Sequence, residues 1–128
     1  ICGAYQFYGW GSSMSTVIVD EGKVSWGPHP LAKGVEIKNL LTKKDHGADV
    51  TCVLVKLPKG SVVPEHIHKE QDDILFFLEG RCKMFIEGIG EFEAKKGMLI
   101  RIPKNTRHSV PEVYEDTLLY DVFSPALV

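Results

Sequence analysis

The sequence predicts an all-β domain, either a sandwich or a barrel, and three observations support this prediction. Short runs of β-branched, aromatic and other apolar residues recur about every 8 to 12 residues. Glycine, proline and asparagine lie between these runs, as they do in turns. No stretch of the chain has a long 3.6-residue periodicity bounded by helix caps. The predicted fold is therefore built from strands that short turns connect.

Six segments are predicted to be strands, each from its own pattern. The first is rich in valine and ends at a Pro-Lys-Gly turn, and the second is apolar throughout, which predicts a buried strand. The third and fourth alternate apolar and polar residues, which predicts half-buried strands. The fifth leads into Pro103, and the sixth completes the domain. In chain order the segments are 50–57, 74–78, 82–87, 91–94, 98–102 and 117–123.

The first 13 residues differ in composition from the rest of the chain. Aromatic residues lie among glycines here, and Gly-Ser-Ser before Met14 resembles a flexible linker that precedes a native initiator methionine. The basic and continuously apolar regions of a signal peptide are absent. We interpret residues 1–13 as a vector-derived or flexible segment, with a genuine arm that packs on a neighbour as the alternative. No repeat, low-complexity tract or linker divides residues 14–128, which are predicted to form a single domain.

Composition and charge exclude several classes of protein. The chain has 128 residues, of which 44% are hydrophobic and 25% charged, so it can form a packed core without a disulfide or a structural metal. With 15 basic and 17 acidic side chains, the formal net charge is −2, which argues against a nucleic-acid or anionic-membrane partner. No run approaches the roughly 20 apolar residues that cross a bilayer.

The cysteines indicate a reducing compartment. The chain has three, which is an odd number for a framework of disulfide bridges. Cys52 and Cys82 lie inside predicted strands, where a small thiol packs as an apolar residue. We therefore predict that both are core residues and that the protein is cytoplasmic.

Three histidines and an aspartate carry the predicted chemistry. His66 and His68 are two residues apart, so on a strand their imidazoles point to the same face and can share one ion. Asp73 offers a carboxylate at the start of the next predicted strand, and His108 follows a turn that can return a later strand to the first pair. Imidazole and carboxylate suit one divalent transition metal ion (Zn, Ni, Fe, Mn, Co or Cu), whereas Ca²⁺ and Mg²⁺ prefer oxygen ligands.

An isolated His-x-His pair on an exposed strand is more often two solvated histidines than a metal site. Here the flanking residues favour the metal site. The pair follows a Pro-Lys-Gly turn, and the apolar segment 74–78 draws the Asp73 carboxylate into a buried environment, where an uncompensated charge is unfavourable. The spacing and the flanking residues together therefore predict a metal site in this part of the chain.

Two patterns in the same region resemble the two motifs of the cupin superfamily. They cover residues 60–108, and the strand pattern extends the similarity over about residues 34–125. The resemblance implies a double-stranded β-helix, a jelly-roll barrel, whose mouth holds one metal ion with the three histidines and Asp73 as ligands. The two patterns are Gly60-x5-His66-x-His68-x4-Asp73-x6-Gly80 and Gly97-x5-Pro103-x-Asn105-x2-His108.

The sequence departs from the family motifs at three positions. Asp73 stands where the family usually has glutamate, and its side chain is one methylene shorter. The fourth ligand therefore stays open, since Gln71, Asp72 or water can take this place. Asn105 replaces a turn glycine, and asparagine is among the residues that best adopt the left-handed conformation. Glu112 stands where the second motif often ends in asparagine.

The last predicted strand carries a second candidate group. Asp121 and Phe123 share one of its faces, and Asp121 is either a capped structural carboxylate or a group poised for acid–base chemistry. The segment 121–125 is similar to the ending of the small cupins of pectin degradation, which linearise unsaturated monouronates into open-chain keto acids. This resemblance implies that Asp121 and Phe123 are catalytic residues beside the metal. It weakens after Pro125, where the charged tail of that subfamily is missing.

Two kinds of side chain near these motifs receive the simpler interpretation. Arg101 and Arg107 flank the second motif and could clamp a substrate carboxylate, but solvated positions on the rim are favoured for both. His29 lies between two prolines in a turn-like segment, and we interpret it as a surface residue without a role. A P-loop, a Gly-x-Gly-x-x-Gly motif, a Cys-x-x-Cys pair and a serine nucleophile motif are all absent, so no organic cofactor is predicted.

Three functions follow from this site. The first is a metal-dependent lyase or isomerase that acts on a small sugar acid such as an unsaturated uronate, with Asp121 moving the proton. The second is a metal-dependent dioxygenase, which the three-histidine environment fits almost equally well. The third is a cupin that binds a small ligand without turnover. In each case the partner is a small molecule, and the chain has no DNA-binding helix for nucleic acid.

Assembly is predicted from the N-terminal part of the domain. Small cupins resemble one another in forming homodimers, often by lending an N-terminal strand to the partner's sheet. Segments 17–19 and 35–37 have the β-branched character of such strands. The resemblance therefore implies a homodimer.

Overall fold

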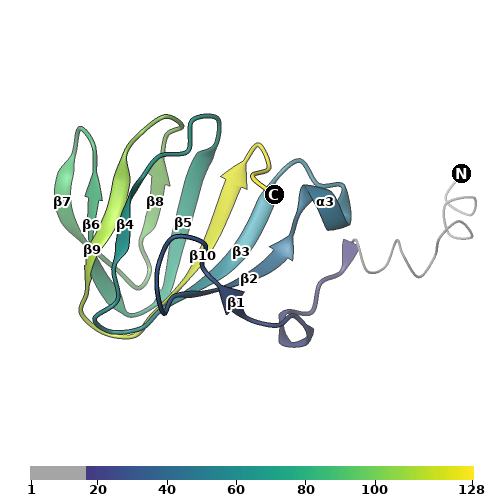
Figure 1. The fold of residues 1–128 in the computed structure, drawn as a ribbon, viewed down its shortest axis with the longest axis horizontal. Helices are drawn as coiled ribbons and strands as arrows, with labels where there is room; N and C mark the ends of the chain where they lie inside the picture. The colour runs from purple at the N-terminus through teal and green to yellow at the C-terminus, as the bar shows by residue number, and fades with distance from the viewer. Residues whose placement is uncertain (1–16) are drawn as a thin grey trace, which may run out of the picture.

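The computed structural model describes residues 17–128, and the predicted segment 1–13 lies outside the described residues. The predicted all-β class is confirmed, because two antiparallel sheets make up most of the molecule (Figure 1). The six-stranded sheet has the order β1-β2-β3-β10-β5-β8, and the four-stranded sheet has the order β4-β9-β6-β7. The strands are β1 Gly27–Pro28, β2 Glu36–Leu41, β3 Thr51–Leu57, β4 Val63–His66, β5 Asp72–Glu79, β6 Arg81–Ile86, β7 Gly90–Lys95, β8 Leu99–Ile102, β9 His108–Val113 and β10 Thr117–Ser124.

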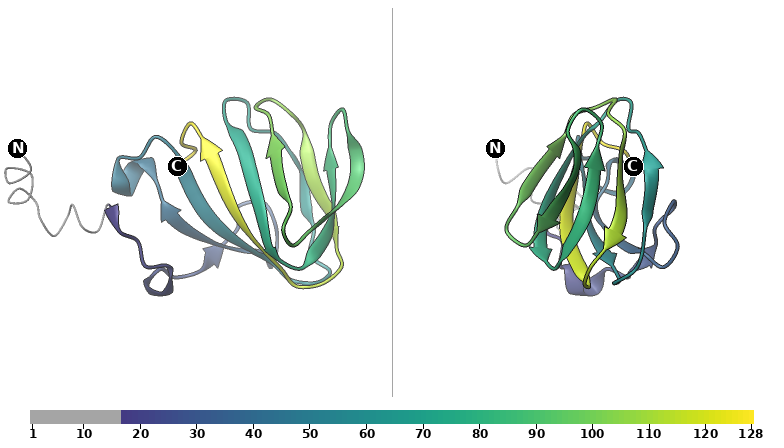
Figure 2. Two further views of the ribbon diagram at one scale, coloured as in Figure 1. Left: turned by 180° about the vertical axis from the view of Figure 1, so that it is seen from behind. Right: turned by 90° about the vertical axis from the view of Figure 1, so that its left-hand side faces the viewer.

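The core lies between the two sheets, which face each other when the molecule is seen end on (Figure 2). Side chains alternate between the two faces of a strand, and every second residue of β3, β6 and β10 is buried. Phe77 of β5, Leu57 of β3 and Met84 of β6 are among the largest fully buried side chains. Both inner faces therefore contribute to one hydrophobic core.

Within residues 18–128, helical structure is limited to two short segments. They are the 3₁₀ turn η1 Glu21–Lys23 and the helix α3 Lys43–His46. Thr42 caps α3 because its hydroxyl accepts a hydrogen bond from the Asp45 N–H at 3.0 Å. Neither segment is long and apolar enough to cross a membrane.

All six predicted strands are present, with boundaries within two residues of those predicted. The segment 35–37, which we expected to pair with a partner molecule, instead leads into β2, which pairs with β3 of the same chain. β4 and β9 were not predicted as apolar runs, because Pro64 and Pro111 interrupt them. These two strands pair with each other, and they carry two of the predicted histidines.

The turn of the second motif is anchored to the first motif. Asn105 has a φ of 60°, so this asparagine adopts the left-handed conformation that was expected of it. Its backbone N–H donates a hydrogen bond of 2.7 Å to the carbonyl of His68. The two loops that carry the candidate ligands are thereby held against each other.

Candidate metal centre

The three predicted histidines meet at one point. β4 ends at His66 and β9 begins at His108, and these two residues are partners across the sheet. His68 lies two residues beyond the end of β4, which corrects the expectation that His66 and His68 share one strand. One nitrogen from each ring lies within 4.8 Å of the other two. The described residues therefore contain a cluster that can hold a metal ion.

Backbone carbonyls fix the orientation of two of these rings. Nδ1 of His66 lies 2.8 Å from the Pro64 carbonyl, and Nδ1 of His108 lies 2.9 Å from the Thr106 carbonyl. A carbonyl can only accept a hydrogen bond, so Nδ1 of each ring carries the proton and Nε2 keeps a free lone pair. This is the arrangement that a metal-binding histidine requires, with one nitrogen held by the protein and the other available to the ion.

Burial keeps the rings in the form that binds metal. Burial is the largest influence on the pKa of both His66 and His68, and it lowers each pKa below 6.5. The two rings are therefore neutral at pH 7. Nε2 of His108 is buried and has no hydrogen-bond partner among the described residues. A buried lone pair without a partner is unfavourable, and a bound cation would satisfy it.

Asp73 extends the cluster with a carboxylate. Its Oδ2 lies 3.3 Å from Nε2 of His108 and 3.9 Å from Nε2 of His68. Burial raises the pKa of Asp73, but contacts with Asp121 and His108 outweigh it, and the resulting pKa is below the usual value. An ionised oxygen thus faces an imidazole lone pair, and two such acceptors are stabilised by a cation between them. Three imidazoles with a carboxylate beside them are donors of the kind that divalent transition metals bind.

A second carboxyl group, Asp121, faces the first. Asp121 lies on the inner face of β10 and is only 6% exposed. Its pKa is raised well above the usual value, first by burial and then by the negative charge of Asp73. This shift favours the protonated form of Asp121. Phe123, on the same face of β10, packs edge-on against the His68 ring at 5.1 Å between centroids.

The alternatives for the fourth ligand have other partners. The Gln71 amide donates to the carbonyl of Ala126 at 3.4 Å. Asp72 accepts hydrogen bonds from the Arg101 side chain at 2.9 Å and from the Lys104 N–H at 2.9 Å. Gln71 and Asp72 thus point away from the histidines, and Asp73 is the carboxylate that the fold brings to them.

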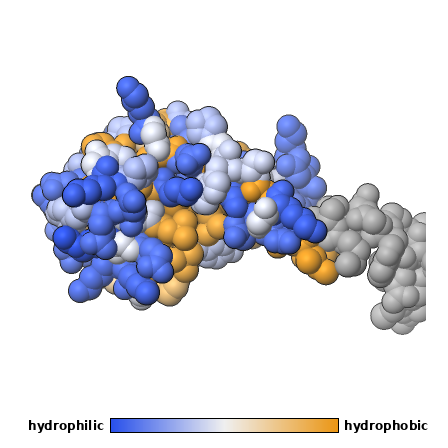
Figure 3. All heavy atoms as spheres, turned by 90° about the horizontal axis from the view of Figure 1, so that it is seen from below, coloured by the Kyte–Doolittle hydropathy of each residue, from blue (hydrophilic) through white to orange (hydrophobic). Residues whose placement is uncertain are grey.

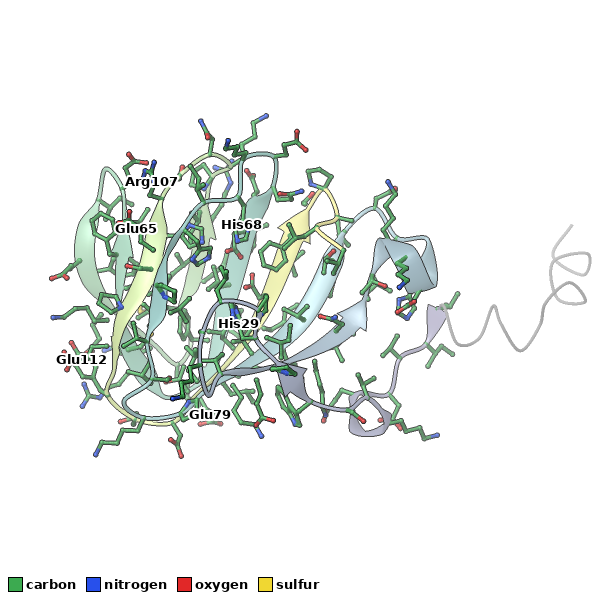
Figure 4. The ribbon with its side chains drawn as sticks, viewed as in Figure 1. His29, Glu65, His68, Glu79, Arg107 and Glu112 are labelled. Carbon is green, nitrogen blue, oxygen red and sulfur yellow. The ribbon has the colours of Figure 1, made fainter. Side chains whose placement is uncertain are left out.

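A cavity of about 300 Å³ opens beside the cluster. The three histidines, Asp73, Asp121 and Phe123 line it, together with many apolar side chains from both sheets. Among the described residues, no lysine or arginine lines this cavity. Arg107 instead lies on the surface, where its guanidinium is 3.9 Å from the Glu65 carboxylate (Figure 4). This agrees with the solvated rim position that the sequence analysis favours over a substrate clamp. The cavity is large enough for a small organic molecule.

Sequence reasoning missed one residue of the cavity. His29 was expected to be a surface residue without a role, but it lines the cavity together with the three clustered histidines. Burial lowers the pKa of His29, and a smaller contribution comes from His66. The prolines on both sides of His29 indicate only a turn. Its position follows from the pairing of β1 with β2, which no local pattern near His29 could predict.

The fold and the cluster define a class of protein, a jelly roll with a candidate site for one metal ion. The cupin domain model matches residues 53–123. The chain belongs to the cupin family, and the predicted double-stranded β-helix is confirmed.

The chain is similar to one curated protein and to several solved structures. It is 32% identical over 95 residues, 74% of this chain and 82% of the relative, to the pectin degradation protein KdgF of Dickeya dadantii (strain 3937). The structure of KdgF from Halomonas sp. matches with a TM-score of 0.71 and 25% identity, over 84% of this chain and 94% of that one. A predicted oxalate decarboxylase from Thermotoga maritima matches with a TM-score of 0.74 and 22% identity, over 85% and 99%, which shows the fold alone.

Proposed function

We propose that this protein is a metal-dependent cupin enzyme that converts a small sugar acid by lyase or isomerase chemistry, with an unsaturated monouronate as the substrate. The observation that carries the proposal is the convergence of three imidazoles and two buried carboxyl groups on one cavity. The similarity to the pectin degradation protein KdgF supports the substrate class, because lyases that cleave polyuronates release unsaturated monouronates.

The proposed ligands are His66, His68 and His108, with Asp73 as the fourth. A bound divalent transition ion would polarise a carbonyl or ring oxygen of the substrate. The chain itself keeps the His66 and His68 rings neutral, and backbone carbonyls orient the His66 and His108 rings. The apolar walls of the cavity exclude water from the substrate, which strengthens each polar contact made inside.

Linearisation of an unsaturated monouronate is an isomerisation that moves a proton. The bond between the anomeric carbon and the ring oxygen breaks, and the ring oxygen keeps the electron pair. The anomeric hydroxyl loses its proton and becomes an aldehyde. The enolate that remains takes up a proton on the double-bond carbon that does not bear the oxygen, and the oxygen-bearing carbon becomes a ketone. Atoms and electrons balance without an oxidant or a reductant.

Asp121 is the proposed group that moves this proton. The candidate ligands cannot exchange protons while they bind a metal, and Asp121 is the remaining carboxyl group that lines the cavity in the described residues. It is buried, and burial together with the negative charge of Asp73 raises its pKa, which favours the protonated form. Phe123 is proposed to hold the sugar ring beside this carboxyl group, since its own ring packs against His68.

The proposal is tested by metal-loaded turnover. Protein stripped of metal is reloaded separately with zinc, nickel, manganese or iron(II) and incubated with a 4,5-unsaturated galacturonate. Loss of the ultraviolet absorbance of the conjugated double bond reports the reaction, and an oxygen electrode runs in parallel. We expect faster loss than in buffer and no oxygen uptake. Oxygen uptake with substrate would establish the dioxygenase alternative instead, and no acceleration with any metal would refute catalysis on this substrate.

Asp121→Asn tests the role of the buried carboxyl group. The substitution nearly conserves volume and still accepts a hydrogen bond, but it cannot transfer a proton. We expect unchanged metal content and fold, with turnover at least about tenfold lower. Tyr120→Phe is the matched control, because Tyr120 lies on the opposite face of β10 and is expected to leave turnover unchanged. Parent-like turnover in Asp121→Asn, or its unfolding, would return Asp121 to a structural role.

A further inference from the structure

We propose that His29 is a substrate-binding residue whose Nε2–H donates a hydrogen bond to the carboxylate of the sugar acid. The inference rests on the proposed function, and it adds a binding group from outside the two cupin motifs. His29 lies on the loop that leads from β1 to β2, and Figure 4 labels it below His68. The same cavity that the candidate ligands line is also lined by His29.

The backbone holds this ring in a defined place. Pro28 and Pro30 fix their own φ angles, and the residue before a proline is restricted to extended conformations. The His29 N–H donates to the Val35 carbonyl at 2.9 Å, which closes the base of the loop. Pro28 also pairs with Glu36 of β2. The loop is therefore a short, anchored hairpin connection, and His29 needs little ordering when a ligand binds.

Hydrogen bonds also determine which nitrogen of His29 carries the proton. Nδ1 lies 3.0 Å from the Leu31 nitrogen and 3.2 Å from the Ala32 nitrogen, and it accepts from both N–H groups. A nitrogen that accepts cannot carry a proton, so the neutral ring is protonated on Nε2. The lowered pKa of His29 agrees with a neutral ring. Among the described residues, Nε2 has no hydrogen-bond partner, and its N–H remains available to a ligand.

A carboxylate bound in this cavity would meet few hydrogen-bond donors besides His29. No lysine or arginine of the described chain lines the cavity, so the acid cannot form an ion pair with a side chain there. The Thr51 hydroxyl also lines it, but this hydroxyl already donates to the Val128 carbonyl at 2.9 Å. Besides His29, Asp121 and the histidines proposed as ligands, Asn39 and Ser109 are the other lining side chains that can donate. A hydrogen bond to a charged oxygen is among the stronger kinds, so His29 is expected to contribute measurably to affinity.

The test compares two variants at this position in the zinc-loaded protein. His29→Asn keeps an acceptor near the position of Nδ1 and removes the donor, whereas His29→Gln places an amide nitrogen near the position of Nε2. Calorimetry measures binding of D-galacturonate and of D-galactose, which lacks the carboxylate. We expect His29→Asn to bind galacturonate about tenfold more weakly and galactose as the parent does. His29→Gln is expected to recover part of the galacturonate affinity.

A second measurement needs no variant. Nitrogen-15 spectra of the histidine rings in the parent are expected to show His29 protonated on Nε2, with this resonance shifted by galacturonate and unmoved by galactose. The inference is overturned if the proton is on Nδ1, if galacturonate leaves the resonance unmoved, or if His29→Asn binds both sugars as the parent does.

Failure of the inference and failure of the proposed function give different results. A parent that binds galacturonate but does not convert the unsaturated uronate contradicts the reaction alone, and the His29→Asn comparison still decides the role of His29. A parent that converts the unsaturated uronate while its affinity for galacturonate is unaffected by His29→Asn contradicts the role of His29 alone. A parent that neither binds nor converts either acid contradicts both.

Discussion

At the scale of single residues, the surroundings of Asp73 explain how a shorter carboxylate can serve where the family usually has glutamate. Asp73 is the second residue of β5, and its neighbour across the sheet is Phe123 of β10. Its Oδ2 is within 4 Å of two of the clustered rings, and its Oδ1 is buried without a partner in the described chain. The additional methylene of glutamate is therefore not needed for the carboxylate to reach the rings.

Removal of single ligands is expected to separate their contributions to metal binding. His66→Ala and His108→Ala should each lose most of the bound metal, because each ring is one of the three proposed nitrogen ligands. Asp73→Ala should lose less, since water can take the place of one carboxylate oxygen. Zinc content per chain after gel filtration measures the effect, and circular dichroism checks the fold. His46→Ala is the control, because His46 accepts from the Thr42 N–H outside the cavity. Full zinc occupancy in all three ligand variants would contradict the assignment.

Cys82 is expected to make the free energy of unfolding depend on pH in the alkaline range. Its side chain is 0% exposed, and burial, with a smaller effect of Glu93, raises the pKa of the thiol from 9.0 to about 12. Between these values the unfolded chain releases the thiol proton and the folded chain keeps it. This contribution to stability is therefore complete below pH 9.0 and is lost as the pH rises toward about 12, by about 1.4 kcal/mol per pH unit.

Urea unfolding at several alkaline pH values measures this dependence. Cys82→Ala should show a smaller decrease of the unfolding free energy with pH than the parent. Val113→Ala is the control, since Val113 is the buried cross-strand neighbour of Cys82 and does not titrate. It should be less stable at every pH but retain the parent's slope. Equal slopes for Cys82→Ala and the parent would show that Cys82 does not cause the dependence.

The candidate metal site could be predicted because its residues are close in sequence or follow recognisable turns. The spacing of His66 and His68 and the apolar strand after Asp73 predict, without knowledge of the fold, that these three side chains lie together. The orientation of the rings could not be predicted, because it depends on carbonyls of Pro64 and Thr106 that have no distinguishing sequence. His29 was missed for a similar reason, since its place depends on a hairpin rather than on its neighbours.

At the scale of elements, prediction succeeded where apolar residues are continuous or alternate cleanly. β5 and β6 have such patterns and were found within two residues of their ends. β4 and β9 were not among the six segments predicted from apolar patterns, because each contains a proline and part of each is exposed. The register between these two strands also shifts between Val63 and His66, so β4 does not alternate regularly between buried and exposed residues. The irregular strands are the ones that present His66 and His108.

The turn between β5 and β6 depends on Gly80. Its φ is +82°, and a Cβ at this position would meet the backbone of Asp116 and Thr117. Gly80→Ala is expected to lower the free energy of unfolding by at least about 3 kcal/mol, from the left-handed conformation and the overpacking together. Gly88→Ala is the control, since its φ of +88° is similar but its surroundings are open, and about 1 kcal/mol is expected. Urea unfolding measures both, and equal losses would contradict the role of close packing at Gly80.

At the scale of the whole molecule, the outer face of the six-stranded sheet carries a row of apolar side chains. Cross-strand partners place four large side chains side by side on this face, and Phe76 is 38% and Leu99 is 65% exposed. The segment 17–19, which was also expected to supply a strand to a partner, belongs to neither sheet. Figure 3 shows hydrophobic side chains where the described chain begins, next to the residues drawn in grey. In order across the sheet, the apolar row is Leu54, Tyr120, Phe76 and Leu99.

This apolar row supports the predicted homodimer, with a contact different from the exchange of strands first expected. β2 pairs with β3 of its own chain, so the segment 35–37 is not available to a partner in this structure. A twofold contact places the same patch of two copies together. An apolar row can pack against its own copy, whereas a row of like charges would repel its copy. Exposed apolar patches of this kind commonly mark interfaces. We therefore expect two copies to associate through the outer face of the six-stranded sheet.

Light scattering at micromolar concentration, with residues 1–13 removed, tests this assembly. The parent is expected to have the mass of a dimer. Leu99→Lys should give a monomer, because two lysines would be buried against each other at the contact, while its exposed position leaves the fold intact. Ile89→Lys is the matched control, since Ile89 is 72% exposed but lies in the turn between β6 and β7 of the other sheet. A monomeric parent would refute the homodimer, and a dimeric Leu99→Lys variant would place the contact on another surface.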